Sequence, residues 1–261
     1  MSHIPKIPQQ DDPPRWRRPA GPIPPQPPTA APREPMLTMP TSVIVMIALM
    51  GIIHLIRDQL TYRDDLMVLA WFAFIPARYS GEWSVLPGGI GADVWTFVTY
   101  ALLHGSMTHI ITNCVWLLAF GSAVARRFGA WRFWVFSGVC AAGGAGLHLL
   151  FHPGDAVPMV GASAAISGQM AGAVRFVFDD GGPLVFRRSG DLGRFRRPAR
   201  PLAAVLTNKK ALAFIVIWFA INLAVGLGSA ATGAIVIAWE AHLGGFLVGL
   251  LAFRLFDPVP R

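Results

Sequence analysis

Charged side chains are scarce in this chain. Asp, Glu, Lys and Arg make up 14% of its 261 residues, whereas hydrophobic residues make up 54%, and the mean hydropathy is +0.50. Soluble domains carry about 25% charged residues. The scarcity excludes an ordinary soluble domain and predicts an all-α, polytopic membrane protein, because helices satisfy their own backbone hydrogen bonds in lipid.

Cysteine is rare as well. The chain has two cysteines, Cys114 and Cys140, and both lie in apolar runs. This placement gives no indication of a structural disulfide framework. We expect both to be small residues of the core.

Acidic residues are fewer than basic ones, 14 against 22, which leaves a formal net charge of +8. Most of the Lys and Arg residues lie in short segments beside apolar runs, where basic residues set membrane orientation. We therefore expect the lipid bilayer, and no nucleic acid, as the partner of these charges. The side that includes both ends of the chain carries most of them, which predicts cytoplasmic termini in a bacterial inner membrane.

Residues 1–40 lack apolar periodicity and hold 13 of the 22 prolines. A segment of this composition cannot bury a core, so we expect a disordered cytoplasmic tail. It is not expected to be a signal peptide, because the apolar run follows too late and no small-residue cleavage site stands out. The membrane domain is predicted to occupy residues 41–256.

Six stretches of this domain are long or apolar enough to cross a bilayer at about 20 residues each. They run approximately over Thr41–Leu60, Thr96–Gly121, Phe133–Leu150, Val160–Phe178, Ala211–Leu227 and Thr232–Phe253. The first outer loop, 61–95, contains an apolar piece, 66–76, that is too short to cross. We expect this piece to lie in the membrane interface, where Trp is favoured.

Two polar residues stand out in the apolar stretches. Ser163 follows Gly161 at the predicted start of the fourth span, and His242 lies in the sixth. A helix N-terminus favours an oxyanion, and a histidine at membrane depth is a candidate base for a serine nucleophile. The alternative is structural: a serine that bonds its own backbone and a histidine that packs between helices.

The second predicted span carries His109 and Asn113, four residues apart and hence on one helical face. Both side chains can donate hydrogen bonds toward a developing oxyanion. Metal binding through these two and His104 is the alternative, but no carboxylate or cysteine completes a ligand set, so neither metal nor cofactor is expected. His148 and His152 are expected to be solvated residues at a helix end.

Small residues recur beside Ser163 and His242. Gly245 and Gly249 form a G-x-x-x-G pair, a pattern of close helix packing. Close packing is what residues on two helices need in order to meet. Glu240 lies two positions before His242, about 200° around a helix, and is therefore expected to point away from it.

Together these motifs resemble the rhomboid family of intramembrane serine proteases: His-x-x-x-Asn, then Gly-x-Ser, then Ala-His-x-Gly-Gly, in successive spans of residues 41–256. The resemblance implies that Ser163 is the nucleophile and His242 its base. It also implies that His109, Asn113 and the Ser163 backbone N–H stabilise the oxyanion. A helical bundle with an outward-open, water-filled cavity and single-span membrane proteins as substrates are further implications; the oligomeric state stays open.

Three features depart from the family pattern. Ala164 stands where a glycine usually follows the nucleophile, and Trp95-Thr96 replaces a common Trp-Arg pair. Ser167 stands where some members have an aromatic residue, so we expect a hydrogen bond from Ser167 to orient His242. Ala164 is the only support for an alternative function, a catalytically inactive relative that binds transmembrane helices as a chaperone or trafficking factor.

Overall fold

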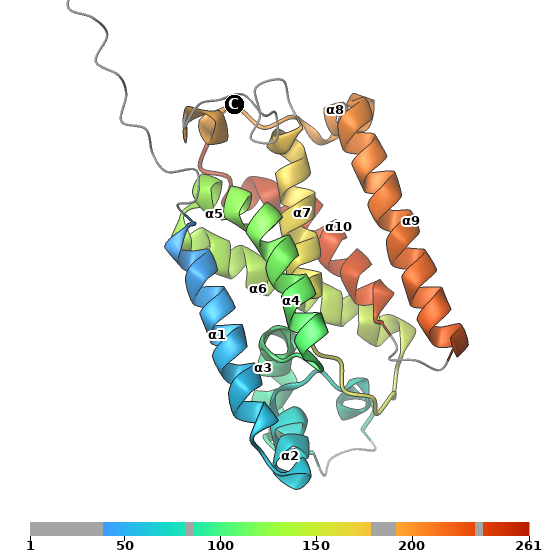
Figure 1. Cartoon of the computed structure of the whole chain (residues 1–261). Coiled ribbons are helices and arrows are strands. Elements are labelled where there is room, and N and C mark those ends of the chain that lie inside the picture. Colours follow the sequence, from blue (N-terminus) through green and yellow to red (C-terminus); the bar gives the residue numbers. More distant parts are fainter. Residues whose placement is uncertain (1–38, 82–85, 179–191, 233–236, 261) are drawn as a thin grey trace, which may run out of the picture. The chain divides into compact units, whose positions relative to one another are not determined.

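The computed structural model describes residues 39–81, 86–178, 192–232 and 237–260 (Figure 1). The predicted disordered tail lies almost wholly outside these residues. Every regular element within them is helical, and the one strand-like feature is an isolated antiparallel bridge between Phe74 and Met159. The all-α prediction is confirmed.

The helices are α1 (Thr41–Asp58), α2 (Tyr62–Phe72), α3 (Gly89–Thr99), α4 (Met107–Trp116), α5 (Ser122–Phe128), α6 (Ala130–Phe151), α7 (Ser163–Val177), α8 (Leu202–Thr207), α9 (Lys209–Thr232) and α10 (Trp239–Phe256). A π-helical segment, Leu117–Gly121, joins α4 to α5. Short 3₁₀ segments occur at Pro76–Tyr79, Tyr100–Leu102 and Leu192–Arg196.

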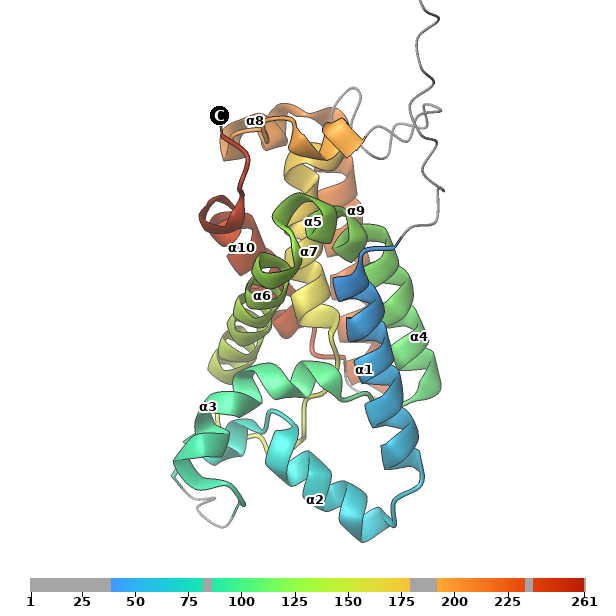
Figure 2. The ribbon, with the colours of Figure 1, turned by 90° about the vertical axis from the view of Figure 1, so that its left-hand side faces the viewer.

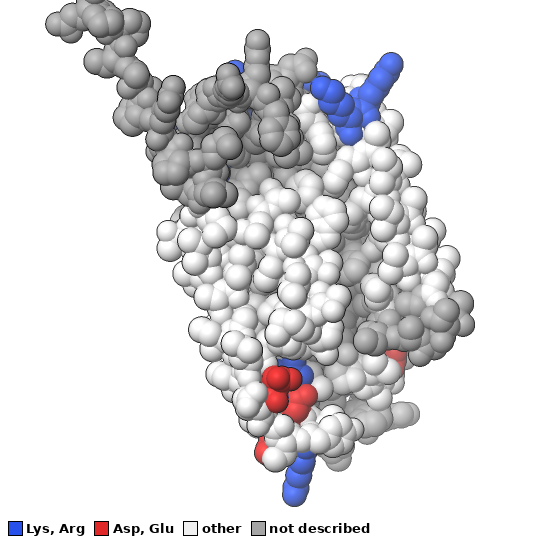
Figure 3. All heavy atoms as spheres, viewed as in Figure 1, with Lys and Arg blue, Asp and Glu red and all other residues white. Residues whose placement is uncertain are grey.

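Five of the described helical stretches are long and apolar enough to cross a membrane: Thr41–Asp58, Met107–Phe128, Ala130–Phe151, Lys209–Gly228 and Trp239–Phe256. Figure 3 shows an uncharged surface between two ends that carry charged side chains. The described helices also expose many large hydrophobic side chains, which suits a lipid environment. The chain is an integral membrane protein.

The remaining predicted span corresponds to α7, which has 15 residues, all but the first of them buried. In both Figure 1 and Figure 2 this helix lies among the longer ones, and it packs on α6 and α10. The other helices shield α7 from lipid, so the usual length of about 20 residues does not apply to it.

The chain enters α7 as an extended segment. Met159 exchanges two backbone hydrogen bonds with Phe74, at 3.1 and 2.8 Å, and Gly161 donates one to the Tyr100 carbonyl at 3.0 Å. Irregular backbone is tolerated at membrane depth only where protein or water satisfies its polar groups. Because these bonds replace helical ones, α7 begins at Ser163, three residues later than predicted.

Two other spans begin well after the residue that was predicted. The second span begins at Met107 instead of Thr96, because the chain breaks before Ser106, whose hydroxyl caps the new helix by accepting the His109 N–H at 3.2 Å. The sixth begins at Trp239 instead of Thr232, a residue that belongs to α9. Hydropathy alone did not separate these apolar segments from the loops beside them.

The first outer loop folds into two short helices, α2 and α3, which Figure 2 shows below the long helices. Trp95 stacks on Trp71 with ring centroids 6.2 Å apart and donates its indole N–H to the Trp71 carbonyl at 2.8 Å. Arg78 donates to the carbonyls of Ala70 and Pro87. The loop is therefore anchored although Thr96 stands where an arginine was expected.

Glycines bring α7 and α10 into backbone contact. A Cβ added at Gly245 would lie on the Ala164 carbonyl, 2.7 Å from its carbon, and one added at Gly249 would lie 2.5 Å from the Gly168 Cα. Side chains at these positions would push the helices apart. The predicted role of this G-x-x-x-G pair is thus visible as close packing of α10 on α7.

We predict that Gly245→Ala lowers the midpoint of thermal unfolding by several degrees, because overpacking a close contact costs about 1–3 kcal/mol. The measurement is thermal unfolding of the purified protein in detergent. Gly146→Ala in α6 is the matched control, since a Cβ there meets nothing within 4 Å. Equal midpoints for the two variants would contradict the packing argument.

Candidate active site

Ser163 and His242 meet across the contact between α7 and α10. The Oγ of Ser163 lies 2.7 Å from the Nε2 of His242. Ser163 is the first residue of α7 and His242 is in the first turn of α10, and both are half-buried. The predicted pair is therefore a hydrogen-bonded pair in the folded chain.

A third residue, Asn222 of α9, holds the other side of the imidazole. Its Oδ1 lies 2.6 Å from the Nδ1 of His242, and its Nδ2 donates to the Trp239 carbonyl at 3.1 Å. The bond to Trp239 identifies the amide nitrogen, which leaves the oxygen to face the histidine. Asn222 is only 8% exposed, so its amide is committed to these two partners.

This arrangement selects one tautomer of His242. Because Asn222 Oδ1 can only accept, Nδ1 carries the proton, and Nε2 then presents a lone pair to the Ser163 hydroxyl. A serine whose proton can pass to an oriented imidazole is an activated nucleophile. The chain of contacts from Asn222 to His242 to Ser163 thus has the connectivity of a nucleophile, a base and an orienting group.

Asn222 was missed in the sequence analysis, although a signal was present. It is the one amide in an otherwise apolar run of α9 residues, 211–228. Polar residues at membrane depth usually face the protein interior and serve a purpose there. The run itself gives no indication of which partner the amide would meet.

The ring of His109 lies directly against Gly161, two residues before the serine. A Cβ added at Gly161 would lie 2.7 Å from His109 Nε2 and 3.7 Å from Ser163 Oγ. Gly161 has φ +121°, a conformation that other residues rarely adopt. Glycine is thus required at position 161 by the backbone conformation and by the space that the His109 imidazole occupies. These distances place His109 next to Ser163.

His104 supports the His109 ring from the side. The two imidazoles pack edge to face with centroids 5.1 Å apart. Burial, with a further contribution from His109, lowers the pKa of His104 to about 3. His104 is therefore neutral at physiological pH and acts as a packing surface.

Asn113 lies one turn after His109 on the same helix, as predicted. One of its two amide N–H groups donates to the His109 carbonyl at 3.1 Å, and the side chain is buried. The amide nitrogen carries a second N–H donor as well. His109 and Asn113, the predicted oxyanion pair, thus both lie on α4, and the first turn of this helix lies next to Ser163.

Ser167 does not take the place that was predicted for it. Its hydroxyl donates to the Ser163 carbonyl, one turn earlier in α7, at 2.7 Å. Serine hydroxyls inside helices commonly form this bond to the preceding turn. Asn222, from another helix, makes the bond to His242 that was expected of Ser167.

The methyl group of Ala164 is accommodated by α6. It lies against Gly144, where an added Cβ would approach it to 2.5 Å. Ala164 is almost completely buried and its carbonyl receives Gly245. The residue that departs from the family pattern is therefore packed against glycines on both neighbouring helices.

Glu240 points away from His242, as its two-residue spacing indicated. Its carboxylate lies 3.2 Å from His152 Nε2 and 3.9 Å from His148 Nδ1. The expectation that His148 is a solvated residue was wrong: it is 7% exposed, because α6 packs against α10 and His148 faces Glu240.

Comparison with known proteins adds a family relationship. Residues 91–257 match the Rhomboid domain family. The chain is 30% identical over 87 residues to the Rhomboid protease GlpG of Haemophilus influenzae, which is 33% of this chain and 38% of that protein. It is 39% identical over 49 residues to the Rhomboid protease GlpG of Enterobacter sp. (strain 638), 19% and 18% of the two lengths. Each match thus spans less than two fifths of the relative.

We predict that Asn222→Ala slows labelling of Ser163 by a fluorophosphonate probe about tenfold to a hundredfold, because a misplaced catalytic group typically costs this much. Asn222→Asp keeps an acceptor for the Nδ1–H and is expected to recover part of the rate. Labelling rates and thermal midpoints are measured together to separate orientation from unfolding.

Ser167→Ala is the matched control for this prediction. Its hydroxyl bonds only the preceding turn of α7 in the described structure. We expect its labelling rate to stay near that of the unmodified protein. A slower rate for Ser167→Ala than for Asn222→Ala would contradict the assignment of the orienting residue.

Proposed function

This chain belongs to the rhomboid family, and on that basis we propose that it is an intramembrane serine endopeptidase. The observation that carries the proposal is the 2.7 Å separation between Ser163 Oγ and His242 Nε2. Family membership by itself does not fix activity, since function depends on the site. Here the side chains of Ser163 and His242, the proposed nucleophile and base, are in hydrogen-bonding contact.

In the proposed first half-reaction, Ser163 Oγ attacks the carbonyl carbon of the scissile peptide bond. Its proton passes to His242 Nε2, and the resulting imidazolium keeps its Nδ1–H bond to Asn222. His242 then returns the proton to the departing amine, and the C–N bond breaks. An acyl-enzyme on Ser163 and a free amino terminus are the products of this half.

In the second half-reaction, His242 takes a proton from a water molecule, which attacks the acyl carbon. The proton then returns to Ser163 Oγ as the ester bond breaks. The same imidazole thus serves as base and acid in both halves, which is why its orientation by Asn222 matters.

Each half passes through a tetrahedral oxyanion that needs hydrogen-bond donors. We assign this role to the imidazole of His109, the free N–H of Asn113 and the backbone N–H of Ser163. The backbone donor has no acceptor within α7 because it lies in the first turn of that helix. Its location at the positive end of the helix dipole adds to the stabilisation.

The proposed substrates are single-span membrane proteins. An intact helix hides its peptide bonds in its own hydrogen bonds, so the scissile segment must unwind before Ser163 can attack. Substrates with helix-breaking residues near the cleavage site are therefore favoured. The distribution of basic residues supports cytoplasmic termini in a bacterial inner membrane, which puts cleavage near the outer face.

An inactive, helix-binding relative is not favoured. That alternative depended on Ala164 disturbing the site, and the methyl group packs against Gly144 instead. Both side chains of the proposed dyad remain in contact.

We expect Ser163→Ala and His242→Ala each to reduce cleavage of a single-span reporter protein below detection, a loss of at least about 10⁴-fold, because the pair acts as a unit. The measurement is product formation by purified protein in liposomes, with Ser167→Ala as the active control. Wild-type cleavage by either dyad variant would refute the protease proposal.

His109→Ala and Asn113→Ala are each expected to lower kcat by about 10²–10³-fold, since removal of one oxyanion donor typically has this cost. KM should change little, because the oxyanion exists only in the transition state. A change confined to KM would assign these residues to substrate binding instead.

A further inference from the structure

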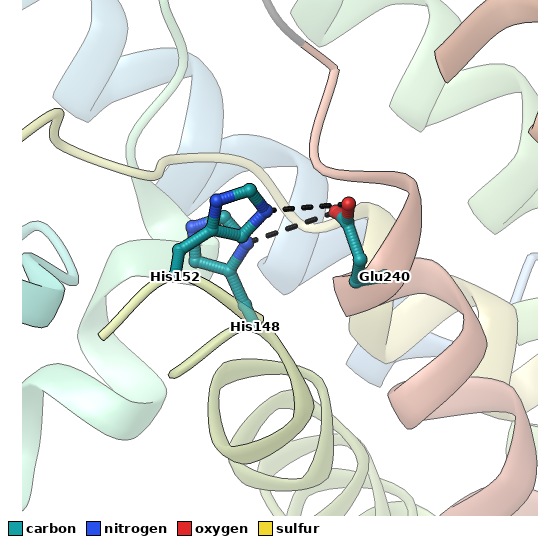
Figure 4. Close-up of side chains that lie close together, drawn as sticks. All are labelled: His148, His152 and Glu240. Atoms are coloured by element: carbon teal, nitrogen blue, oxygen red, sulfur yellow. Dashed lines mark ion pairs between the residues drawn. The ribbon is translucent and has the colours of Figure 1, made fainter. Parts of the chain in front are cut away.

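Two histidines and a glutamate form a largely buried group outside the proposed dyad. His148 lies in the last turn of α6, His152 directly follows that helix, and Glu240 lies in the first turn of α10. Figure 4 shows both imidazole rings turned toward the Glu240 carboxylate. The proposed proteolytic mechanism uses none of the three.

The distances in this group suit a shared ligand. One donor atom from each residue lies within 4.8 Å of the others, and His152 Nε2 lies 3.2 Å from Glu240 Oε1. A tetrahedral zinc ion with bonds of about 2.0–2.2 Å holds its ligands about 3.3–3.5 Å from one another. Small side-chain rotations would bring His148 Nδ1 into the same range.

His148 shows the clearest indication that a partner belongs here. Its side chain is 9% exposed, and its Nδ1 has no hydrogen-bond partner among the described residues. The 3.9 Å to Glu240 Oε2 is too long for a hydrogen bond. Buried nitrogens are almost always satisfied in folded proteins, so an unpaired one aimed at a carboxylate points to a ligand between them.

The charge of Glu240 leads to the same conclusion. Its side chain is 8% exposed in a helix that crosses the membrane, and a buried carboxylate requires a compensating cation. A divalent ion bound to all three residues supplies that charge.

We propose that His148, His152 and Glu240 bind a transition-metal ion of the zinc class, with the fourth position taken by water. Two imidazole nitrogens and one carboxylate oxygen form a donor set that zinc uses in proteins. Magnesium and calcium prefer ligand sets made of oxygen alone. His152, whose side chain is 33% exposed, gives the ion a route from solvent.

The bound ion would join the segments that carry the dyad. His152 begins the connection that leads to Ser163, and Glu240 lies two residues before His242. A metal held by both, and by His148, ties the end of α6 to the start of α10. Its binding should therefore stabilise the folded chain.

The test uses the full chain in detergent, purified with a tag that contains no histidine and treated with EDTA. We expect one equivalent of Zn²⁺ by calorimetry, the visible absorption of tetrahedral Co²⁺, and a thermal midpoint raised by about 5 °C at a hundredfold excess of metal over Kd. Mg²⁺ should give none of these. No readout depends on proteolysis, so the result is independent of the proposed function.

Glu240→Gln and His152→Ala are each expected to weaken Zn²⁺ binding at least about a hundredfold and to abolish the Co²⁺ band. The first keeps the shape of the side chain and the second lies at the partly exposed rim, so both variants should fold. The matched control is His54→Ala with His104→Ala, which removes two other histidines with unpaired buried nitrogens.

The control variant should bind Zn²⁺ as the unmodified chain does. The proposal is overturned if the unmodified chain binds no stoichiometric Zn²⁺, if Glu240→Gln and His152→Ala bind it unchanged, or if only the control loses it. The last outcome would place the ion near His104 instead.

Discussion

The backbone contact between α7 and α10 is the constraint on which the candidate site depends. Gly245 lies on the carbonyl of Ala164, at a distance that no side chain would permit. His242 is three residues before Gly245 and so faces the same helix, and Ser163 directly precedes Ala164. The absence of a side chain at position 245 is therefore what allows the 2.7 Å contact between imidazole and hydroxyl.

The segment just before α7 is extended and not helical, and this conformation positions Ser163 for the contact. Backbone bonds from Met159 and Gly161 to the first outer loop and the Tyr100 carbonyl satisfy the extended segment. The helix N-terminus, with its unpaired N–H groups, consequently lies within the domain and next to the serine. The short length of α7 and the position of Ser163 at its first residue thus both follow from the extended segment before this helix.

α9 adds a polar contact from a helix that otherwise faces outward, with only 17% of its apolar span buried. Asn222 links this loosely packed helix to His242, so the orientation of the imidazole depends on where α9 lies. On the other side of α10, Glu240 faces the end of α6. The first turn of α10 therefore presents two chemically distinct faces, one toward the serine and one toward a histidine pair.

The sequence by itself determined the all-α class, the membrane location and the candidates Ser163 and His242, because a polar residue is conspicuous in an apolar run and hydropathy is a local property. Only the tertiary structure decided that Asn222, and not Ser167, contacts the imidazole, and that Glu240 gathers two histidines around it. Such contacts join helices far apart in the chain, and their geometry follows from how closely small residues on several helices allow backbones to approach. How closely two helix backbones approach cannot be read from any short stretch of sequence.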